Sequence, residues 1–153
     1  MTRTSLQCRE CKKEYDTAFK YVCEDCFGPL DVKYDFPAIT KDTFTNREHT
    51  YWRYFELLPI EDKSNIVSIG AGMTPLIKAD NLGKKLGLNN LYIKNDSVNP
   101  TFSFKDRPAG VAISKATEFG LTSVGCASTG NLASATAAHA AKAGLPCHVF
   151  APS

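Results

Sequence analysis

Two Cys-x-x-Cys pairs near the start of the chain limit most strongly what it can fold into. Cys8 and Cys11 form the first pair and Cys23 and Cys26 the second, with eleven residues between the pairs. Each pair can wrap a tight turn around one ion, and four thiolates together complete a tetrahedral Zn²⁺ site with no open position for a catalytic water. The segment between them offers two short strands with a thin apolar face, too small to fold without metal, made of Tyr15, Phe19, Tyr21 and Val22. The sequence therefore predicts a structural, zinc-ribbon-like module over residues 1–36.

Two other interpretations of these cysteines stay open, a redox disulfide and thiols that are merely buried. A redox motif normally comes as one pair that opens a helix, whereas two pairs at this spacing favour metal. The remaining cysteines, Cys126 and Cys147, lie in later apolar stretches, where we expect small buried side chains.

Residues 37–73 are expected to form a connecting arm. Four of its apolar residues share one face of a short helix that Pro59 would end, namely Tyr51, Tyr54, Phe55 and Leu58. We expect this face to pack against a core, although an aromatic cluster can also line a ligand site. His49, alone in a polar stretch, is expected at the surface.

The rest of the chain alternates helices and strands, which predicts an α/β fold. A helix over 79–86 and a strand over 90–94 precede a helix that starts after Lys105 and ends at Gly120. A strand over 123–127, a helix over 131–143 and a strand over 147–151 then form a parallel βαβ unit. On the second of these helices, His139 and Lys142 are expected at the solvated edge, and His148 is expected to be an ordinary strand residue.

Lys105 is the candidate nucleophile. It follows a Pro-marked loop containing Phe102 and Phe104 and precedes a helix, so apolar rings and the helix dipole both disfavour its charged form. A partly neutral lysine can form a Schiff base with an aldehyde, which is how enzymes hold pyridoxal phosphate. The alternative is a solvated lysine at a helix N-terminus.

A second candidate site is the turn between strand 123–127 and helix 131–143, formed by Ser128, Thr129, Gly130 and Asn131. Open α/β sheets usually bind ligands at such turns. Backbone N–H groups and the two hydroxyls there suit a substrate carboxylate. Simple capping of the helix by these polar residues is the alternative.

The chain resembles threonine synthases, which belong to the fold type II family of pyridoxal-phosphate enzymes. Three segments carry the resemblance in the family's order: Gly72 to Leu76, Asn99 to Arg107 and Ser128 to Asn131. The resemblance implies that Lys105, Phe104 and Asn131 bind the cofactor and that Ser128 to Asn131 bind the substrate. Some members also carry an N-terminal Cys-x-x-Cys segment. At Ala71 and Met73 the family often has other residues, so the first segment is given no substrate role.

The activity implied by this resemblance is conversion of O-phospho-L-homoserine and water to L-threonine and phosphate by a cofactor-dependent lyase. Cysteate synthases and serine/threonine dehydratases share the lysine and asparagine segments and remain alternatives. The pair Asp106-Arg107 resembles the threonine synthase pattern and favours a phosphorylated substrate. From another class, a non-catalytic zinc-ribbon module with a degenerate enzyme remnant is also open.

The family normally carries a glycine-rich loop for the cofactor phosphate and a partner for the pyridine nitrogen further along the chain. No glycine lies beyond Gly144. We therefore expect residues 74–153 to be the first part of a catalytic domain in a longer enzyme, with an exposed sheet edge. The isolated chain is expected to bind the cofactor poorly. A homodimer is compatible with the full-length enzyme.

Composition excludes several partners. A net charge of +2 is too small to favour a nucleic-acid surface. The first residues contain no apolar core of signal-peptide length, and no apolar run approaches the roughly 20 residues of a membrane span. The sequence thus predicts a cytoplasmic protein that acts on a small amino-acid phosphate.

Overall fold

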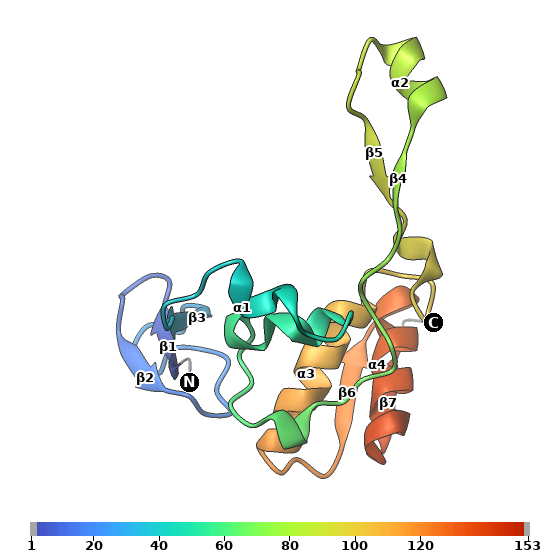
Figure 1. Ribbon diagram of the computed structural model, residues 1–153. Helices are drawn as coiled ribbons and strands as arrows, with labels where there is room; N and C mark the ends of the chain where they lie inside the picture. The colour runs from blue at the N-terminus through green and yellow to red at the C-terminus, as the bar shows by residue number, and fades with distance from the viewer. Residues whose placement is uncertain (1–2, 152–153) are drawn as a thin grey trace.

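The computed structural model describes residues 3–151, which form three small sheets and their connecting helices (Figure 1). The first sheet is antiparallel, with β1 (Arg3–Cys8) between β2 (Glu14–Asp16) and β3 (Leu30–Asp35). Only β2 forms between the two cysteine pairs, instead of the two strands expected there. Phe19 and Tyr21 are 67% and 77% exposed, so they give a second strand no buried face, and Val22 makes only an isolated bridge to Pro29.

The connecting arm contains α1 (Asp42–Thr45) and two 3-10 helices, η1 (Tyr51–Leu57) and η2 (Lys63–Asn65). The expected packing of η1 is confirmed, because Tyr51 and Trp52 are buried in a cluster with Ile60 and Ala71. The expected face was partly wrong: Tyr54 is 38% exposed and has non-helical dihedral angles. The chain kinks at Tyr54, which turns this ring away from Tyr51, and Trp52 joins Tyr51 in the buried cluster instead.

A hairpin follows in which β4 (Leu76–Lys78) pairs antiparallel with β5 (Tyr92–Lys94), with α2 (Asp80–Leu86) at its tip. Gly87 ends α2 in the left-handed conformation, at φ +70°, as its position predicts. The hairpin projects away from the other elements (Figure 1). A short 3-10 helix, η3 (Asp96–Val98), leads from it to the loop before Lys105.

The last part of the described chain confirms the predicted parallel βαβ unit. Strand β6 (Val124–Ala127) pairs in parallel with β7 (Cys147–Phe150), and α4 (Asn131–Ala143) connects them. Helix α3 (Asp106–Glu118) packs against α4 (Figure 1). The core between them contains Val67, Ile113 and Ala140. Lys105 is the residue before α3, as predicted.

One prediction for this region is wrong. His139 is fully buried rather than at the solvated edge of α4, because it faces α3 and the aromatic arm. Lys142, His49 and His148 are exposed, in agreement with the sequence. Cys126 and Cys147 are only half-buried, since the described sheet has two strands and leaves one side of Cys126 open to a groove. No helix within 3–151 has the length and apolar character that a membrane crossing needs.

Candidate functional site

The four N-terminal cysteines converge on one point. Their Sγ atoms all lie within 4.8 Å of one another, with Cys8 and Cys26 3.4 Å apart and Cys11 and Cys23 3.5 Å apart. These separations are too long for a disulfide bond of about 2.05 Å. They are close to the roughly 3.8 Å expected between sulfur atoms that each lie 2.3 Å from a tetrahedral Zn²⁺. The geometry fits a metal site and not a disulfide.

The two pairs reach this point by the same turn. The N–H of Lys12 donates to the carbonyl of Cys8 over 3.1 Å, and the N–H of Phe27 donates to that of Cys23 over 3.0 Å. Both donors are left-handed, at φ 64° and 57°. Side chains other than glycine rarely adopt this conformation, and it costs about 1 kcal/mol or more. Two turns that both adopt this unfavourable conformation indicate that a favourable interaction of the four sulfur atoms compensates for the strain.

Hydrogen bonds prepare at least one of these thiols to act as a ligand. The hydroxyl of Tyr15 donates to Cys23 Sγ over 3.0 Å, and with backbone N–H groups of Cys26 and Asp25 it lowers the pKa of Cys23 to about 6. The pKa of Cys11 is raised to about 12: the backbone N–H of Lys13 opposes this shift, and burial and the neighbouring thiols outweigh it. Four adjacent thiolates repel one another, so a cation is the natural centre of the cluster.

The loop before Lys105 is held by buried polar groups. Asp106, fully buried, accepts hydrogen bonds from both the backbone N–H and the hydroxyl of Thr101, over 2.8 and 2.7 Å. The hydroxyl of Ser103 accepts from the N–H of Lys105 over 3.2 Å. These contacts close residues 101–106 into a defined turn that presents the Lys105 side chain.

The Lys105 amine itself is half-buried and forms no ion pair within residues 3–151. Its Nζ lies 4.9 Å from the centre of the Phe104 ring. Phe102 is 80% exposed, so only one of the two rings that were expected to crowd the amine does so. The amine is therefore available to a ligand.

Arg107 points away from the Lys105 amine to another partner. It donates to both carboxylate oxygens of Asp96 over 2.6 and 2.8 Å and to the Thr74 hydroxyl over 3.2 Å. These bonds lower the pKa of Asp96 to about 2, Arg107 being the largest cause and Thr74 the next. The backbone N–H of Gly72 also donates to the buried Asn99 side chain over 2.9 Å. The turn at 72–76 is thereby joined to the loop at 96–107.

The turn at 128–131 keeps its polar groups free. Gly130 is the N-cap of α4, and no described side chain forms a capping hydrogen bond. The alternative interpretation, in which these polar residues simply cap the helix, is therefore wrong. Ser128 Oγ accepts a weak hydrogen bond from the N–H of Gly130 over 3.3 Å. The side chains of Thr129 and Asn131 are exposed and make no hydrogen bond within the described chain.

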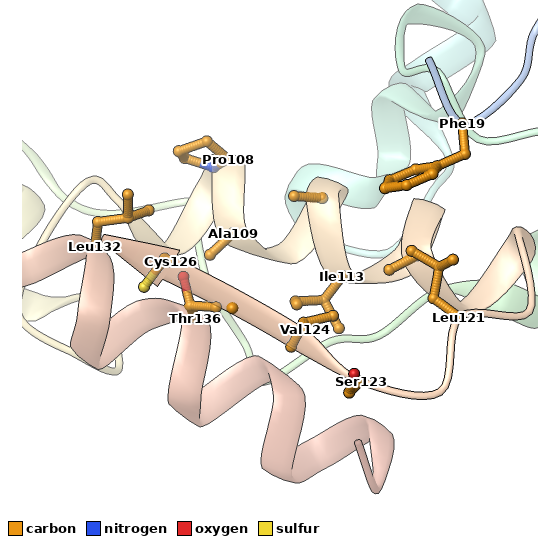
Figure 2. Close-up of a pocket in the computed structure, with 13 residues that line it drawn as sticks. Phe19, Pro108, Ala109, Ile113, Leu121, Ser123, Val124, Cys126, Leu132 and Thr136 are labelled. Atoms are coloured by element: carbon orange, nitrogen blue, oxygen red, sulfur yellow. The ribbon is translucent and has the colours of Figure 1, made fainter. Parts of the chain in front are cut away.

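Residues that follow this turn and the Lys105 turn line one groove. Pro108, near the start of α3, and Leu132, in the first turn of α4, both line a groove of about 450 Å³ beside Cys126 (Figure 2). Leu121 and Ser123 mark its other end (Figure 2). No hydrogen bond joins Lys105 to residues 128–131 in the described structure. The first turns of the two helices line this groove, whereas Lys105 and residues 128–131 are not among its lining residues.

Residues 67–153 match the family of pyridoxal-phosphate dependent enzymes. The chain belongs to this family. It is 44% identical over 151 residues to a threonine synthase of Methanocaldococcus jannaschii, covering 95% of this chain and 37% of that protein. A threonine synthase of Methanosarcina acetivorans is also 44% identical, over 150 residues, with 96% and 36% covered. One from Halalkalibacterium halodurans is 46% identical over 99 residues, with 65% and 28% covered.

These matches confirm the resemblance to threonine synthases and, with it, a pyridoxal-phosphate enzyme of fold type II. The chain spans little more than a third of the length of the first two relatives. The residues described fit the cofactor. Lys105 offers an amine that forms no ion pair within residues 3–151. Asn131 is exposed at the start of α4, where no described side chain caps the helix.

The sequence analysis missed the buried residues behind the lysine. Tyr51 was assigned only to packing, and His139 to the surface. A histidine within an alanine-rich helix offered no signal by itself. Alanines occupy every face of this helix, so no apolar periodicity distinguishes its buried side from its exposed side.

Proposed function

We propose that this chain is the part of a threonine synthase that carries the cofactor lysine. The reaction is the conversion of O-phospho-L-homoserine and water to L-threonine and phosphate. The observation that carries the proposal is the Lys105 amine, which directly precedes α3 and forms no ion pair within residues 3–151. It stands in a chain similar along 95% of its length to a protein named threonine synthase.

The roles of the individual residues follow from their positions. Lys105 would hold the aldehyde group of pyridoxal phosphate, with Phe104 and Asn131 as further contacts. Bound there, the cofactor supplies an electron sink for carbanion charge on the substrate. The free amine of Lys105 can accept a proton from a substrate carbon and return it. The N–H groups at the start of α4 and the hydroxyls of Ser128 and Thr129 would hold the substrate carboxylate, with Gly130 leaving the backbone accessible.

We further propose that Cys8, Cys11, Cys23 and Cys26 bind one structural Zn²⁺. The support is the convergence of the four sulfur atoms and the two equal turns that bring them there. All four ligands come from the protein, which leaves no position for a reacting water. In this arrangement, residues 1–36 form the metal module, 37–73 the connecting arm and 74–153 the catalytic part.

The first test is an absorbance spectrum of the purified chain with added pyridoxal phosphate. A band near ~410–420 nm that is absent from Lys105→Ala supports the proposal. Lys142→Ala, which removes an exposed lysine of α4, is the matched control and should keep the band. Equal bands in the parent and in Lys105→Ala would show that Lys105 is not the lysine concerned.

The second test concerns the substrate. Phosphate release and threonine formation are measured from O-phosphohomoserine in the longest polypeptide that contains this chain. Turnover of O-phosphoserine instead would favour a cysteate synthase, and formation of a keto acid from serine or threonine would favour a dehydratase. No turnover of any of them, without a Lys105-dependent band, would favour the non-catalytic module.

A further inference from the structure

Three buried polar side chains from three elements meet behind the Lys105 turn, and the proposed chemistry uses none of them. Tyr51 of η1 is 8% exposed, whereas Asp106 of α3 and His139 of α4 are fully buried. His139 Nδ1 lies 4.0 Å from Asp106 Oδ1. Burying three such groups together is costly unless they satisfy one another. Their arrangement therefore calls for an explanation.

The histidine has a defined hydrogen-bonding state. Its Nδ1 lies 2.9 Å from the carbonyl oxygen of Ala135, which can only accept, so Nδ1 carries the proton. In the neutral ring, Nε2 is then a bare acceptor. Nε2 and the hydroxyl of Tyr51 are both buried and without a hydrogen-bond partner in the described chain. One is an acceptor and the other is a donor.

Gly110 shows that these two atoms face the same point. A β-carbon on Gly110 would lie 2.3 Å from the Tyr51 hydroxyl oxygen and 3.1 Å from His139 Nε2. Glycine is unfavourable inside a helix such as α3, yet any side chain here would collide with the phenol. Burial also raises the pKa of Tyr51, with a smaller contribution from Asp106 and an opposing one from Arg107, so the phenol keeps its proton.

We propose that Tyr51 and His139 are positioning residues for Lys105, and that they act through Asp106. In this proposal the unpartnered Tyr51 hydroxyl comes to donate to His139 Nε2 and fixes the ring, whose Nδ1–H bonds the Ala135 carbonyl and whose Nδ1 lies 4.0 Å from Asp106 Oδ1. Asp106 in turn closes the Lys105 turn through its two bonds from Thr101. The consequence for Lys105 chemistry rests on the proposed function, whereas the ordering of the turn does not.

The ordering is tested without cofactor by amide hydrogen exchange at Thr101, whose N–H donates to Asp106. Tyr51→Phe removes one oxygen and leaves the ring. It should speed exchange at Thr101 about tenfold, the effect of losing one hydrogen bond near a charged group. Tyr54→Phe removes a phenol oxygen from an exposed ring of the same segment and is the matched control. If the phenol is truly unpaired, Tyr51→Phe will leave exchange unchanged, and the proposal is overturned.

A double-mutant cycle makes the test specific. His139→Asn keeps a donor in the place of Nδ1 but has no group at Nε2. Tyr51→Phe should then have no further effect on exchange in the His139→Asn background, since the acceptor is gone. Additive effects of the two changes would mean that the residues act separately, against the proposal.

The link to Lys105 is tested by borohydride trapping of pyridoxal phosphate, with the labelled lysines mapped by peptide mass. Tyr51→Phe should lower the rate at Lys105 about tenfold relative to Lys142 in the same sample. Faster Thr101 exchange with unchanged Lys105 trapping would refute the positioning role. If the longest polypeptide that contains this chain shows no preference for Lys105, the proposed function fails, while the exchange result still decides whether Tyr51 and His139 order the turn.

Discussion

Removal of the metal from the cysteine cluster should unfold the N-terminal module and leave the rest of the chain folded. Within residues 3–36, Leu6 is the one buried apolar side chain besides the two cysteines. Burying such a side chain contributes about 1.5–3 kcal/mol. A structural Zn²⁺ bound by four thiolates contributes roughly 10–16 kcal/mol at pH 7. The metal term is several times larger, so the sheet β2-β1-β3 should depend on it.

The assay is amide hydrogen exchange resolved by segment, before and after a strong chelator, with zinc content measured by atomic absorption. The chain should contain one Zn²⁺. Chelation should remove protection from β1 and β3 and leave protection in α3 and α4. Cys8→Ser should resemble the chelated protein, whereas Cys147→Ser, outside the cluster, should keep both zinc and protection. Full protection of β1 in metal-free protein would refute the reasoning.

Three further predictions concern the catalytic part. Asp106→Ala should lower the free energy of unfolding by about 3 kcal/mol, because the N–H and the hydroxyl of Thr101 both lose their acceptor. Asp106→Asn can still pair with both Thr101 groups and should cost less, as denaturant titration would show. Asp96, whose pKa Arg107 lowers from 3.8 to about 2, should stabilise the fold above pH ~4 and lose this effect as pH falls towards 2. Asp96→Asn should lower the free energy of unfolding by about 1 kcal/mol at pH 7, after allowance for its partial exposure, and should make stability fall less steeply as the pH is lowered. Ile113→Ala, in the core between α3 and α4, should cost about 2–5 kcal/mol in the same titration.

Each of these has an outcome that would count against it. Equal stabilities for Asp106→Ala and Asp106→Asn would mean that the Thr101 bonds matter little. If Asp96→Asn loses stability at low pH as steeply as the parent protein, other carboxylates cause the acid sensitivity. A loss below about 1 kcal/mol for Ile113→Ala would show that the contact between the two helices is loose.

The elements that the sequence predicts well are those with a strong local signal. The boundaries of α4 follow from a turn of small polar residues before it and Gly144 after it, and the structure has them at the predicted residues. The spacing of the cysteines likewise predicts a cluster that the structure assembles within 4.8 Å. In both cases, the residues that determine the structure are neighbours along the chain.

The predictions that failed depend on contacts between distant segments. His139 is buried because Tyr51, 88 positions earlier, and α3 cover it, and nothing within α4 reports this. The second strand expected before Cys23 does not form because no described element packs on Phe19 and Tyr21 in the way a strand requires. Local apolar residues predict that a face will be buried, whereas the partner of that face is a property of the whole fold.

The Asp106-Arg107 pair shows how a sequence pattern and its physical role can differ. As a pattern, the pair favoured a phosphorylated substrate, and an arginine beside a catalytic lysine is a natural phosphate ligand. In the structure, both terminal nitrogens of Arg107 donate to Asp96, and Asp106 accepts from Thr101. Turning the Arg107 guanidinium to a phosphate would weaken its two bonds to Asp96 and leave that carboxylate with the Thr74 hydroxyl, which is unfavourable for a group whose pKa is lowered to about 2 chiefly by Arg107. In this structure the pair serves the lysine turn, and if the substrate is O-phosphohomoserine, as proposed, other residues would bind its phosphate.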